Sequence, residues 1–208
     1  MGTSSMSTAA SRPASDAIAV VVMGVAGAGK TTVGRLLAAQ VGASFVDGDD
    51  LHTEAARAKM GAGVPLSDDD RWPWLDRIGQ TLAAGLTARR ATIVACSALR
   101  KAYRDRLRAV VGPALRFVYL AATPEAMRAR VASRSEHYMP AALVDSQFAT
   151  LQEPTPVEHP ITVDVCGRPA DIAVEIVHQL EHRQGSGSRD ELTSRVAPAA
   201  DALSEKRQ

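Results

Sequence analysis

Residues 24–31, with the sequence GVAGAGKT, form the segment with the clearest chemistry and match the phosphate-loop pattern G-x-x-x-x-G-K-[ST] without a mismatch. Glycines let the backbone curl so that successive N–H groups face phosphate oxygens, and the helix that follows adds the positive end of its dipole. Lys30 would reach the β- and γ-phosphates of a nucleoside triphosphate, and the Thr31 hydroxyl would bind Mg²⁺. The predicted nucleotide-binding residues here are Gly24, Val25, Ala26, Gly27, Ala28, Gly29, Lys30, Thr31 and Thr32.

The phosphate loop alone does not identify the class of nucleotide-binding protein. The chain has no N-K-x-D motif, with which a GTPase would read its base, and no LSGGQ-type signature of a transport ATPase. The strand expected at residues 92–95 is followed by Cys96 and Ser97, not by the aspartate of a Walker B motif. The Mg²⁺ partner and the base must therefore come from another strand.

An acidic pair, Asp47 and Asp49, follows the strand expected at residues 44–46. Ligands bind at the carboxyl edge of an open α/β sheet, and Gly48 would allow a tight bend between the two carboxylates. One carboxylate could face Mg²⁺ and its waters while the other accepts a hydrogen bond from an attacking hydroxyl. The alternative is a solvated acidic turn, which the neighbouring phosphate loop disfavours.

Three later segments carry cations that could bind an anionic acceptor. Arg71 follows three aspartates, of which Asp68 and Asp69 are explained by the dipole of a helix that starts there. A guanidinium beside tryptophan can clamp a carboxylate. Residues 97–105 gather further cations at the carboxyl end of a strand, where anion binding competes with simple surface solvation. Arg128, Arg130 and Arg134 lead into a polar loop, as in a closing lid, although a solvated helix face is the alternative.

Apolar runs that alternate with helical patterns predict a three-layer α/β fold, in which helices cover both faces of a five-stranded parallel sheet. One helix after the phosphate loop would bury Val33, Leu36, Leu37 and Val41. An acceptor-binding insertion is expected at about residues 50–88 and a mobile lid at about residues 133–140. The expected strands are residues 17–23, 44–46, 92–95, 116–120 and 161–165, and the other expected helices are residues 69–87, 101–110, 124–134, 140–151 and 169–183.

The composition of the 208 residues is that of one domain, residues 17–183, between disordered tails at residues 1–16 and 184–208. The formal net charge is +1, which gives no indication of a nucleic-acid or membrane partner, and no run approaches the length of a membrane span. The first residues lack the pattern of a signal peptide. Cys96 and Cys166 are expected to be reduced, buried thiols of a cytoplasmic protein.

The sequence contains six segments that are typical of one known family: MGVAGAGKTT, KMGAGVPLSDDDRWPWL, CSALRKAYRDRLR, VDGDDLH, FVYL and SRSEHYMPAALVDSQFATLQEP. Through them it resembles the bacterial gluconate kinases (gluconokinases) of the thermoresistant type. The similarity covers residues 17–183. The segments KMGAGVPLSDDDRWPWL and CSALRKAYRDRLR are far more specific to the family than the phosphate loop. Thr53 and Ala56 depart from the Pro and Asn that the family commonly has there, and Tyr138 stands where it usually has Phe.

The resemblance implies a fold similar to nucleoside monophosphate and shikimate kinases, and the use of ATP, Mg²⁺ and D-gluconate to give 6-phospho-D-gluconate in a homodimer. It implies catalytic roles for Lys30, Asp49 and Arg134, and a metal site of Thr31 with Asp47 acting through water. Adenine is expected between Arg130 and the loop that contains Pro169. The expected acceptor-binding residues are Asp49, His52, Arg71, Ser97, Lys101, Arg104 and His137, with Arg71 or Arg104 on the gluconate carboxylate.

Two other functions are compatible with parts of the sequence. A kinase for another small acceptor, such as shikimate, would have a glycine-rich stretch after the third strand, where this chain has CSALRK. A nucleotide-binding regulator without turnover would not need the Asp47 and Asp49 pair or the lid arginines. The CSALRK segment argues against the first alternative, and the aspartate pair with the lid arginines argues against the second. Together they favour an ATP-dependent gluconate kinase.

Overall fold

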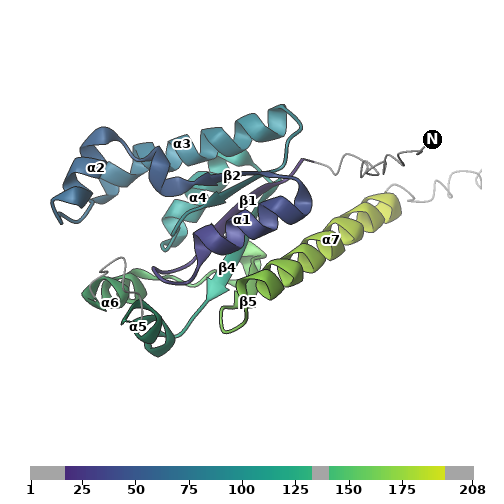
Figure 1. Ribbon diagram of the computed structural model, residues 1–208. Helices are drawn as coiled ribbons and strands as arrows, with labels where there is room; N and C mark the ends of the chain where they lie inside the picture. Colours follow the sequence, from purple (N-terminus) through teal and green to yellow (C-terminus); the bar gives the residue numbers. More distant parts are fainter. Residues whose placement is uncertain (1–16, 133–140, 195–208) are drawn as a thin grey trace, which may run out of the picture.

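The computed structural model describes residues 17–132 and 141–194, and the lid expected at residues 133–140 lies outside this range. The helices and strands alternate along the chain (Figure 1). In chain order they are β1 (Ala19–Met23), α1 (Lys30–Val41), β2 (Ser44–Asp47), η1 (Gly48–Leu51), α2 (Glu54–Gly61), α3 (Asp68–Thr87), β3 (Thr92–Ala95), α4 (Lys101–Val111), β4 (Leu115–Ala121), α5 (Pro124–Ala132), α6 (Ala141–Thr150), η2 (Pro156–Glu158), β5 (Ile161–Asp164) and α7 (Pro169–Ser194).

The five strands form one parallel sheet in the order β2-β3-β1-β4-β5, which confirms the predicted sheet. β1 lies at the centre, and its residues are fully buried because helices cover both faces. Val21 pairs with Val94 of β3 and with Phe117 of β4. Because the strands are parallel, their carboxyl ends meet at one edge, where the phosphate loop begins.

Two apolar clusters join the helices to the sheet and make the fold three-layered. Figure 1 shows α1 and α7 packed side by side, and α3 beside α4 on the other face of the sheet. Leu36 and Val41 are partly buried against the first cluster, so the predicted apolar face of α1 is confirmed. The first cluster includes Val33, Leu37, Ile172 and Ile176, and the second includes Leu75, Ile78, Leu82 and Leu107.

The start of α3 follows from its first residues. The Ser67 side chain accepts from the backbone N–H of Asp70, and the Asp70 carboxylate accepts from the backbone N–H of Ser67 at 2.9 Å. This capping box satisfies two backbone donors that a helix terminus would otherwise leave unpaired. It places α3 at the residue where the sequence pattern predicts a helix start.

Three details differ from the sequence-based expectations. α7 continues past Arg183 to Ser194, into the segment expected to be a disordered tail. The packing of α7 against α1 already nucleates this helix, and adding residues to an existing helix costs less than starting one, even though Gly185 and Gly187 are poor helix formers. α2 forms a separate helix within the expected insertion. Cys96 is buried as expected, but Cys166 is exposed because it follows β5 in a surface turn.

In the described part of the chain, no helix combines the length and the apolar character that crossing a membrane requires.

We predict that Leu82→Ala lowers the free energy of unfolding by about 3 kcal/mol, because it leaves a cavity at a fully buried position between α3 and the sheet. Urea denaturation followed by circular dichroism would measure the change. Gln80→Ala, at an exposed position of the same helix, is the control and should change stability by less than about 0.5 kcal/mol. Equal losses in the two variants would contradict the described packing of α3.

Candidate functional site

The loop between β1 and α1 has the conformation that its glycines predict. Gly24, Gly27 and Gly29 adopt φ values of 143°, 84° and 91°, which side chains rarely tolerate. At Gly24 a Cβ atom would also lie 2.9 Å from the carbonyl oxygen of Leu120. The Gly24 N–H donates to the carbonyl of Ser97 at 3.3 Å, which ties the loop to the residues that follow β3. The loop is therefore held between the ends of three neighbouring strands.

Lys30 curls back over this loop, and its Nζ donates to the carbonyl oxygen of Val25 at 3.0 Å. Burial lowers the pKa of Lys30, while the nearby carboxylates of Asp49 and Asp47 act in the opposite direction. Cys96 lies buried close by, and burial raises the pKa of its thiol to about 12. The thiol is therefore neutral, so Lys30 and the two aspartates are the reactive groups at this end of β1.

Thr31 at the start of α1 and Asp47 at the end of β2 are in direct contact. The Thr31 hydroxyl donates to Oδ2 of Asp47 at 2.9 Å, and Oδ1 of Asp47 accepts from the backbone N–H of Asp49 at 3.2 Å. Mg²⁺ in kinases is bound by oxygen atoms from one or two side chains together with phosphates and water. The hydroxyl and carboxylate oxygens of this pair fit that requirement. The Asp49 side chain is 81% exposed, so its carboxylate is accessible to an acceptor.

Gly48, between the two aspartates, is required for a reason that differs from the expected tight bend. A Cβ atom on Gly48 would lie 2.3 Å from the carbonyl oxygen of Ala95, and the Gly48 carbonyl accepts from the indole N–H of Trp74 at 2.6 Å. The glycine thus lets η1 approach the end of β3. This close approach determines where Asp47 and Asp49 stand relative to the phosphate loop.

His52 is buried beside the same tryptophan, with ring centroids 4.3 Å apart and planes within 10°. Its Nε2 lies 4.0 Å from Oδ1 of Asp49, and among the described residues its buried Nδ1 has no hydrogen-bond partner. Burial lowers the pKa of His52, which favours the neutral ring. The structure therefore places His52 beside Asp49.

A cluster around Asp68 joins the start of α3 to the start of α4. Its carboxylate accepts from Arg100 at 2.7 Å, from Arg71 at 3.4 Å and from the hydroxyl of Tyr103. The Tyr103 hydrogen bond, with Arg100 and Arg71, lowers the pKa of Asp68. Helix-dipole stabilisation was therefore an incomplete explanation of Asp68, because the packing of α3 against α4 provides its partners.

Arg104, one of the two expected carboxylate ligands, lies in the interior with no exposed surface. Its Nε and Nη2 donate to the two carboxylate oxygens of Glu158 at 2.6 and 2.9 Å. Its Nη1 donates to the carbonyls of Ala98 and Leu99 at 3.1 and 3.3 Å. These four bonds involve all three nitrogens of the guanidinium group, and the side chain is fully buried, so the structure does not place Arg104 where an acceptor would reach it. Sequence reasoning could not anticipate Glu158 as its partner.

Two other residues expected to bind the acceptor, Lys101 and Ser97, have partners that belong to their own helix or to the phosphate loop. Lys101 is exposed, and its Nζ pairs with Asp105 one helical turn away at 2.6 Å. Ser97 is half-buried, and its backbone carbonyl contacts the phosphate loop. Arg134 and His137 lie outside the described residues.

Arg130, the residue expected to contact adenine, lies between the phosphate loop and the turn after β5. Its Nη1 donates to the carbonyl of Gly27 at 3.4 Å and its Nη2 to the carbonyl of Val165 at 2.9 Å. It therefore bridges the phosphate loop and the turn that leads to Pro169 at the start of α7. Thr32, the last expected residue of the loop, is exposed on the first turn of α1.

Sequence reasoning did not identify three residues of this region. Arg100 and Tyr103 belong to the Asp68 cluster, and the concentration of cations in residues 97–105 was the signal that could have found Arg100. Gln147 of α6 accepts from the backbone N–H of Ala26 in the phosphate loop at 2.7 Å. Nothing in the sequence around Gln147 indicates this contact, because it joins residues far apart in the chain.

Comparisons with known proteins agree with this geometry. A family profile described as an AAA domain matches residues 20–154. A probable gluconokinase of Schizosaccharomyces pombe is 41% identical over 169 residues, which cover 77% of this chain and 88% of the relative. The thermoresistant gluconokinase of Escherichia coli K12 is 41% identical over 134 residues, 64% of this chain and 76% of the relative. A gluconokinase crystal structure from Sinorhizobium meliloti 1021 has a TM-score of 0.73 and 37% identity, covering 86% of this chain and 98% of that one.

The sheet, the phosphate loop and the carboxylates beside it define a P-loop kinase. The relatives are 37–41% identical to this chain over most of their own length, and this similarity identifies the family within that class. The chain belongs to the gluconokinase family, which confirms the resemblance seen in its sequence.

We predict that Glu158→Gln lowers the free energy of unfolding at pH 7 by about 3 kcal/mol, because it leaves the buried Arg104 guanidinium without a counter-charge. Hydrogen bonds from Arg104 lower the pKa of Glu158 from its ordinary 4.5 to about 2. The stabilisation is therefore present above the ordinary pKa and is lost as the pH falls toward 2. Urea denaturation at pH 7 and at pH 3 would measure both effects.

Glu125→Gln is the matched control, since Glu125 is exposed and makes only a loose pair with Arg128 at 3.6 Å. The control should resemble wild type at both pH values. If wild type and Glu158→Gln lose stability equally between pH 7 and pH 3, the ion pair does not contribute as described.

Proposed function

We propose that this protein transfers the terminal phosphate of ATP to the 6-hydroxyl of D-gluconate, giving 6-phospho-D-gluconate and ADP. The observation that carries the proposal is the contact of Thr31 with Asp47, which sets the acidic end of β2 against the phosphate loop. Membership of the gluconokinase family supports gluconate as the acceptor.

On the donor side, the loop backbone and Lys30 bind the phosphates. The N–H groups of the curled loop face the phosphate oxygens, and the start of α1 adds positive potential. Mg²⁺, which Thr31 and, through water, Asp47 would hold, neutralises phosphate charge when bound. Arg130 supports adenine against the turn before Pro169. Lys30, which is half-buried, stabilises the charge that develops on the transferred phosphate.

On the acceptor side, Asp49 orients the attacking hydroxyl. Its exposed carboxylate stands beside the loop that carries Lys30, and its backbone is held by Asp47. A loose, metaphosphate-like transition state needs little base strength, so an ordinary carboxylate suffices to accept the hydroxyl proton late in the transfer. His52, stacked on Trp74, places its Nε2 4.0 Å from the Asp49 carboxylate on the acceptor side.

The gluconate carboxylate binds to Arg71 and Arg100. Both guanidinium groups are partly exposed, and both now share the carboxylate of Asp68, which shows that two arginines can hold one carboxylate here. The Tyr103 hydroxyl also donates to the Asp68 carboxylate and fixes its position. A substrate carboxylate would use the exposed donors of the same two arginines. Lys101 and Ser97 line the loop next to them.

Arg134 and His137 are proposed to complete the site from the lid when ATP is bound. Arg134 would bring positive charge to the transferring phosphate, and the closed lid would exclude water. A homodimer and a cytoplasmic location also belong to this proposal. The first is supported by the family resemblance, and the second by two free cysteines without the spacing of a disulfide framework.

We predict that Asp49→Asn lowers kcat by about 100-fold or more while the affinity for ATP stays within about twofold of wild type, because only the acceptor hydroxyl loses its carboxylate. A coupled assay of ADP release with gluconate would give kcat, and calorimetry would give nucleotide affinity. The same assay with shikimate, other sugar acids and nucleoside monophosphates would test the choice of acceptor.

Asp50→Asn is the control, because Asp50 is the exposed neighbour of Asp49 and no role is assigned to its side chain. Near-normal kcat in Asp49→Asn would remove Asp49 from the mechanism. A lack of ADP release with gluconate in wild type, together with turnover of another acceptor, would overturn gluconate as the substrate.

We predict that Arg71→Ala and Arg100→Ala each raise the KM for gluconate by about tenfold or more with little change in the KM for ATP, since each removes a charge-assisted bond to the substrate carboxylate. Arg106→Ala is the control, because Arg106 of α4 forms a similar but exposed ion pair with Asp76 at 2.7 Å. An unchanged KM for gluconate in both variants would show that the carboxylate binds elsewhere.

A further inference from the structure

Gln147 of α6 contacts the phosphate loop from outside it. Its side-chain Oε1 accepts from the backbone N–H of Ala26 at 2.7 Å, and the two residues are 121 positions apart in the chain. Gln147 is half-buried and Ala26 is buried, so water is partly excluded from this hydrogen bond. A hydrogen bond is stronger where water is excluded, because the effective dielectric constant is lower there. The bond therefore restrains the direction of the Ala26 N–H.

The peptide unit that joins Val25 to Ala26 also has a partner on its other side. The Val25 carbonyl oxygen accepts from Nζ of Lys30 at 3.0 Å. The peptide bond is trans, so this planar unit directs its C=O and N–H groups in opposite directions. Gln147 and Lys30 therefore hold one rigid unit from opposite sides. The direction that Gln147 gives to the N–H also fixes the direction of the carbonyl that receives Lys30.

The loop itself restrains this peptide unit more weakly. The Val25 carbonyl also accepts from the N–H of Ala28, at a long distance of 3.3 Å. Gly24 and Gly27 flank the two residues with φ values of 143° and 84°, and glycine gives a backbone more conformational freedom than other residues do. The shorter bond from α6 is therefore the stronger restraint on the orientation of the unit.

Packing holds α6 next to the loop. Val144, which is fully buried, belongs to the same apolar cluster as Val25 and Ala28 of the loop. Asp145 accepts from Arg128 of α5 at 2.8 Å, which joins α6 to the neighbouring helix. An apolar cluster and an ion pair thus determine where α6 stands, and the loop contact follows from that position.

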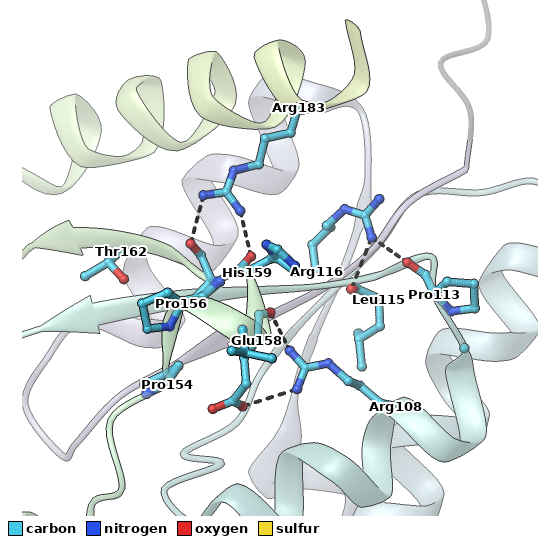
Figure 2. A pocket seen from close by; sticks show the side chains of 13 residues that line it. Arg108, Pro113, Leu115, Arg116, Pro154, Pro156, Glu158, His159, Thr162 and Arg183 are labelled. Carbon is cyan, nitrogen blue, oxygen red and sulfur yellow. Dashed lines mark hydrogen bonds and ion pairs between the residues drawn. The ribbon is translucent and has the colours of Figure 1, made fainter. Parts of the chain in front are cut away.

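Residues 151–160, which follow α6, fix its end to the body of the protein. Figure 2 shows Arg108 directed at Glu158, where it donates to the carboxylate at 3.2 Å and to the backbone carbonyl at 2.7 Å. In the same view Arg183 donates to the carbonyl of His159 at 2.6 Å. The two arginines belong to α4 and α7, which cover opposite faces of the sheet. The side chains of α6 therefore extend from a firmly attached helix.

The orientation of the peptide unit has two consequences for a bound nucleotide. The Val25 carbonyl holds the Lys30 amine over the loop, where the β- and γ-phosphates bind. A carbonyl turned toward the phosphates would place the negative end of its dipole against their oxygens, and the two would repel each other. The acceptor that Gln147 provides therefore favours the orientation in which the loop attracts phosphate.

We propose that Gln147 is a positioning residue of the donor site. Through the peptide unit that joins Val25 to Ala26, it holds Lys30 in place to receive the terminal phosphate of the nucleotide. The effect on phosphate transfer rests on the proposed function, whereas the effect on nucleotide affinity rests on the phosphate loop alone.

The hydrogen bond is tested by amide hydrogen exchange, followed by NMR on the 15N-labelled full chain without nucleotide. Gln147→Met has a side chain of similar length and no amide oxygen, and we expect the Ala26 amide to exchange about tenfold faster in it than in wild type. Gln147→Glu keeps an oxygen acceptor and should return the exchange to within about threefold of wild type. Equal exchange in wild type and Gln147→Met overturns the hydrogen bond, and the proposal with it.

The positioning role is tested by the Kd for ATP, from calorimetry with Mg²⁺ and without gluconate, and by kcat from the coupled assay. We expect Gln147→Met to raise the Kd about fivefold and to lower kcat about tenfold, with the KM for gluconate within about twofold of wild type. The midpoint of thermal unfolding should change by less than about 2 °C, because the side chain is only half-buried. Gln80→Met is the matched control, since it makes the same change at an exposed position of α3 and should resemble wild type in every measurement.

A double-mutant cycle tests whether Gln147 acts through Lys30. If it does, Gln147→Met has little further effect on the Kd for ATP in the Lys30→Ala background. The same loss of affinity in both backgrounds overturns this route. Wild-type Kd and kcat in Gln147→Met overturn the positioning role. A parallel loss of unfolding temperature and of the affinity for both substrates also overturns it, because that pattern indicates a purely structural contact.

Failure of the proposed function gives a different result. If wild type does not phosphorylate gluconate, the choice of acceptor fails. The exchange of the Ala26 amide, the Kd for ATP and the double-mutant cycle need no acceptor, so they still decide the role of Gln147.

Discussion

The parallel pairing of β1 between β3 and β4 is the constraint on which the rest of the structure depends. A strand with neighbours on both sides and helices on both faces must be apolar throughout, and Ala19–Met23 is. The chain can turn only where this strand ends, so the phosphate loop begins at Gly24. Because β3 and β2 run in the same direction beside it, their carboxyl ends bring Ser97 and Asp47 to the same edge.

Close approach of backbones then determines the geometry of the candidate site. Gly48 lies against the carbonyl of Ala95, and Gly24 lies against that of Leu120. A side chain at either position would push the end of one strand away from the next. The two glycines thus set how closely the acidic turn and the phosphate loop stand, and the contact of Thr31 with Asp47 follows from that spacing.

A buried ion pair supports the opposite side of the site. Removing two charges from water is costly, and the pair of Arg104 with Glu158 is maintained because hydrogen bonds engage all three nitrogens of the guanidinium group. These bonds join α4, the loop after β3 and residues 151–160, which connect α6 to β5. An apolar contact of the same size would hold the elements together but would not define the orientation of the Ala98 and Leu99 carbonyls. The pair therefore specifies one arrangement of the loop that carries Arg100.

The sequence by itself determined the fold class and the donor chemistry of this protein. Apolar runs and helix-start residues such as Ser67 depend on neighbours in the chain, and the contacts of a phosphate loop are made by its own backbone. The roles of the arginines were decided only by the tertiary structure. Arg71, Arg100 and Arg104 look equivalent in the sequence, yet Arg104 pairs with a glutamate 54 positions away, whereas the others share Asp68 at a helix junction. The burial of these arginines and their carboxylate partners result from packing between segments that are distant in the sequence. Local sequence patterns therefore cannot predict them.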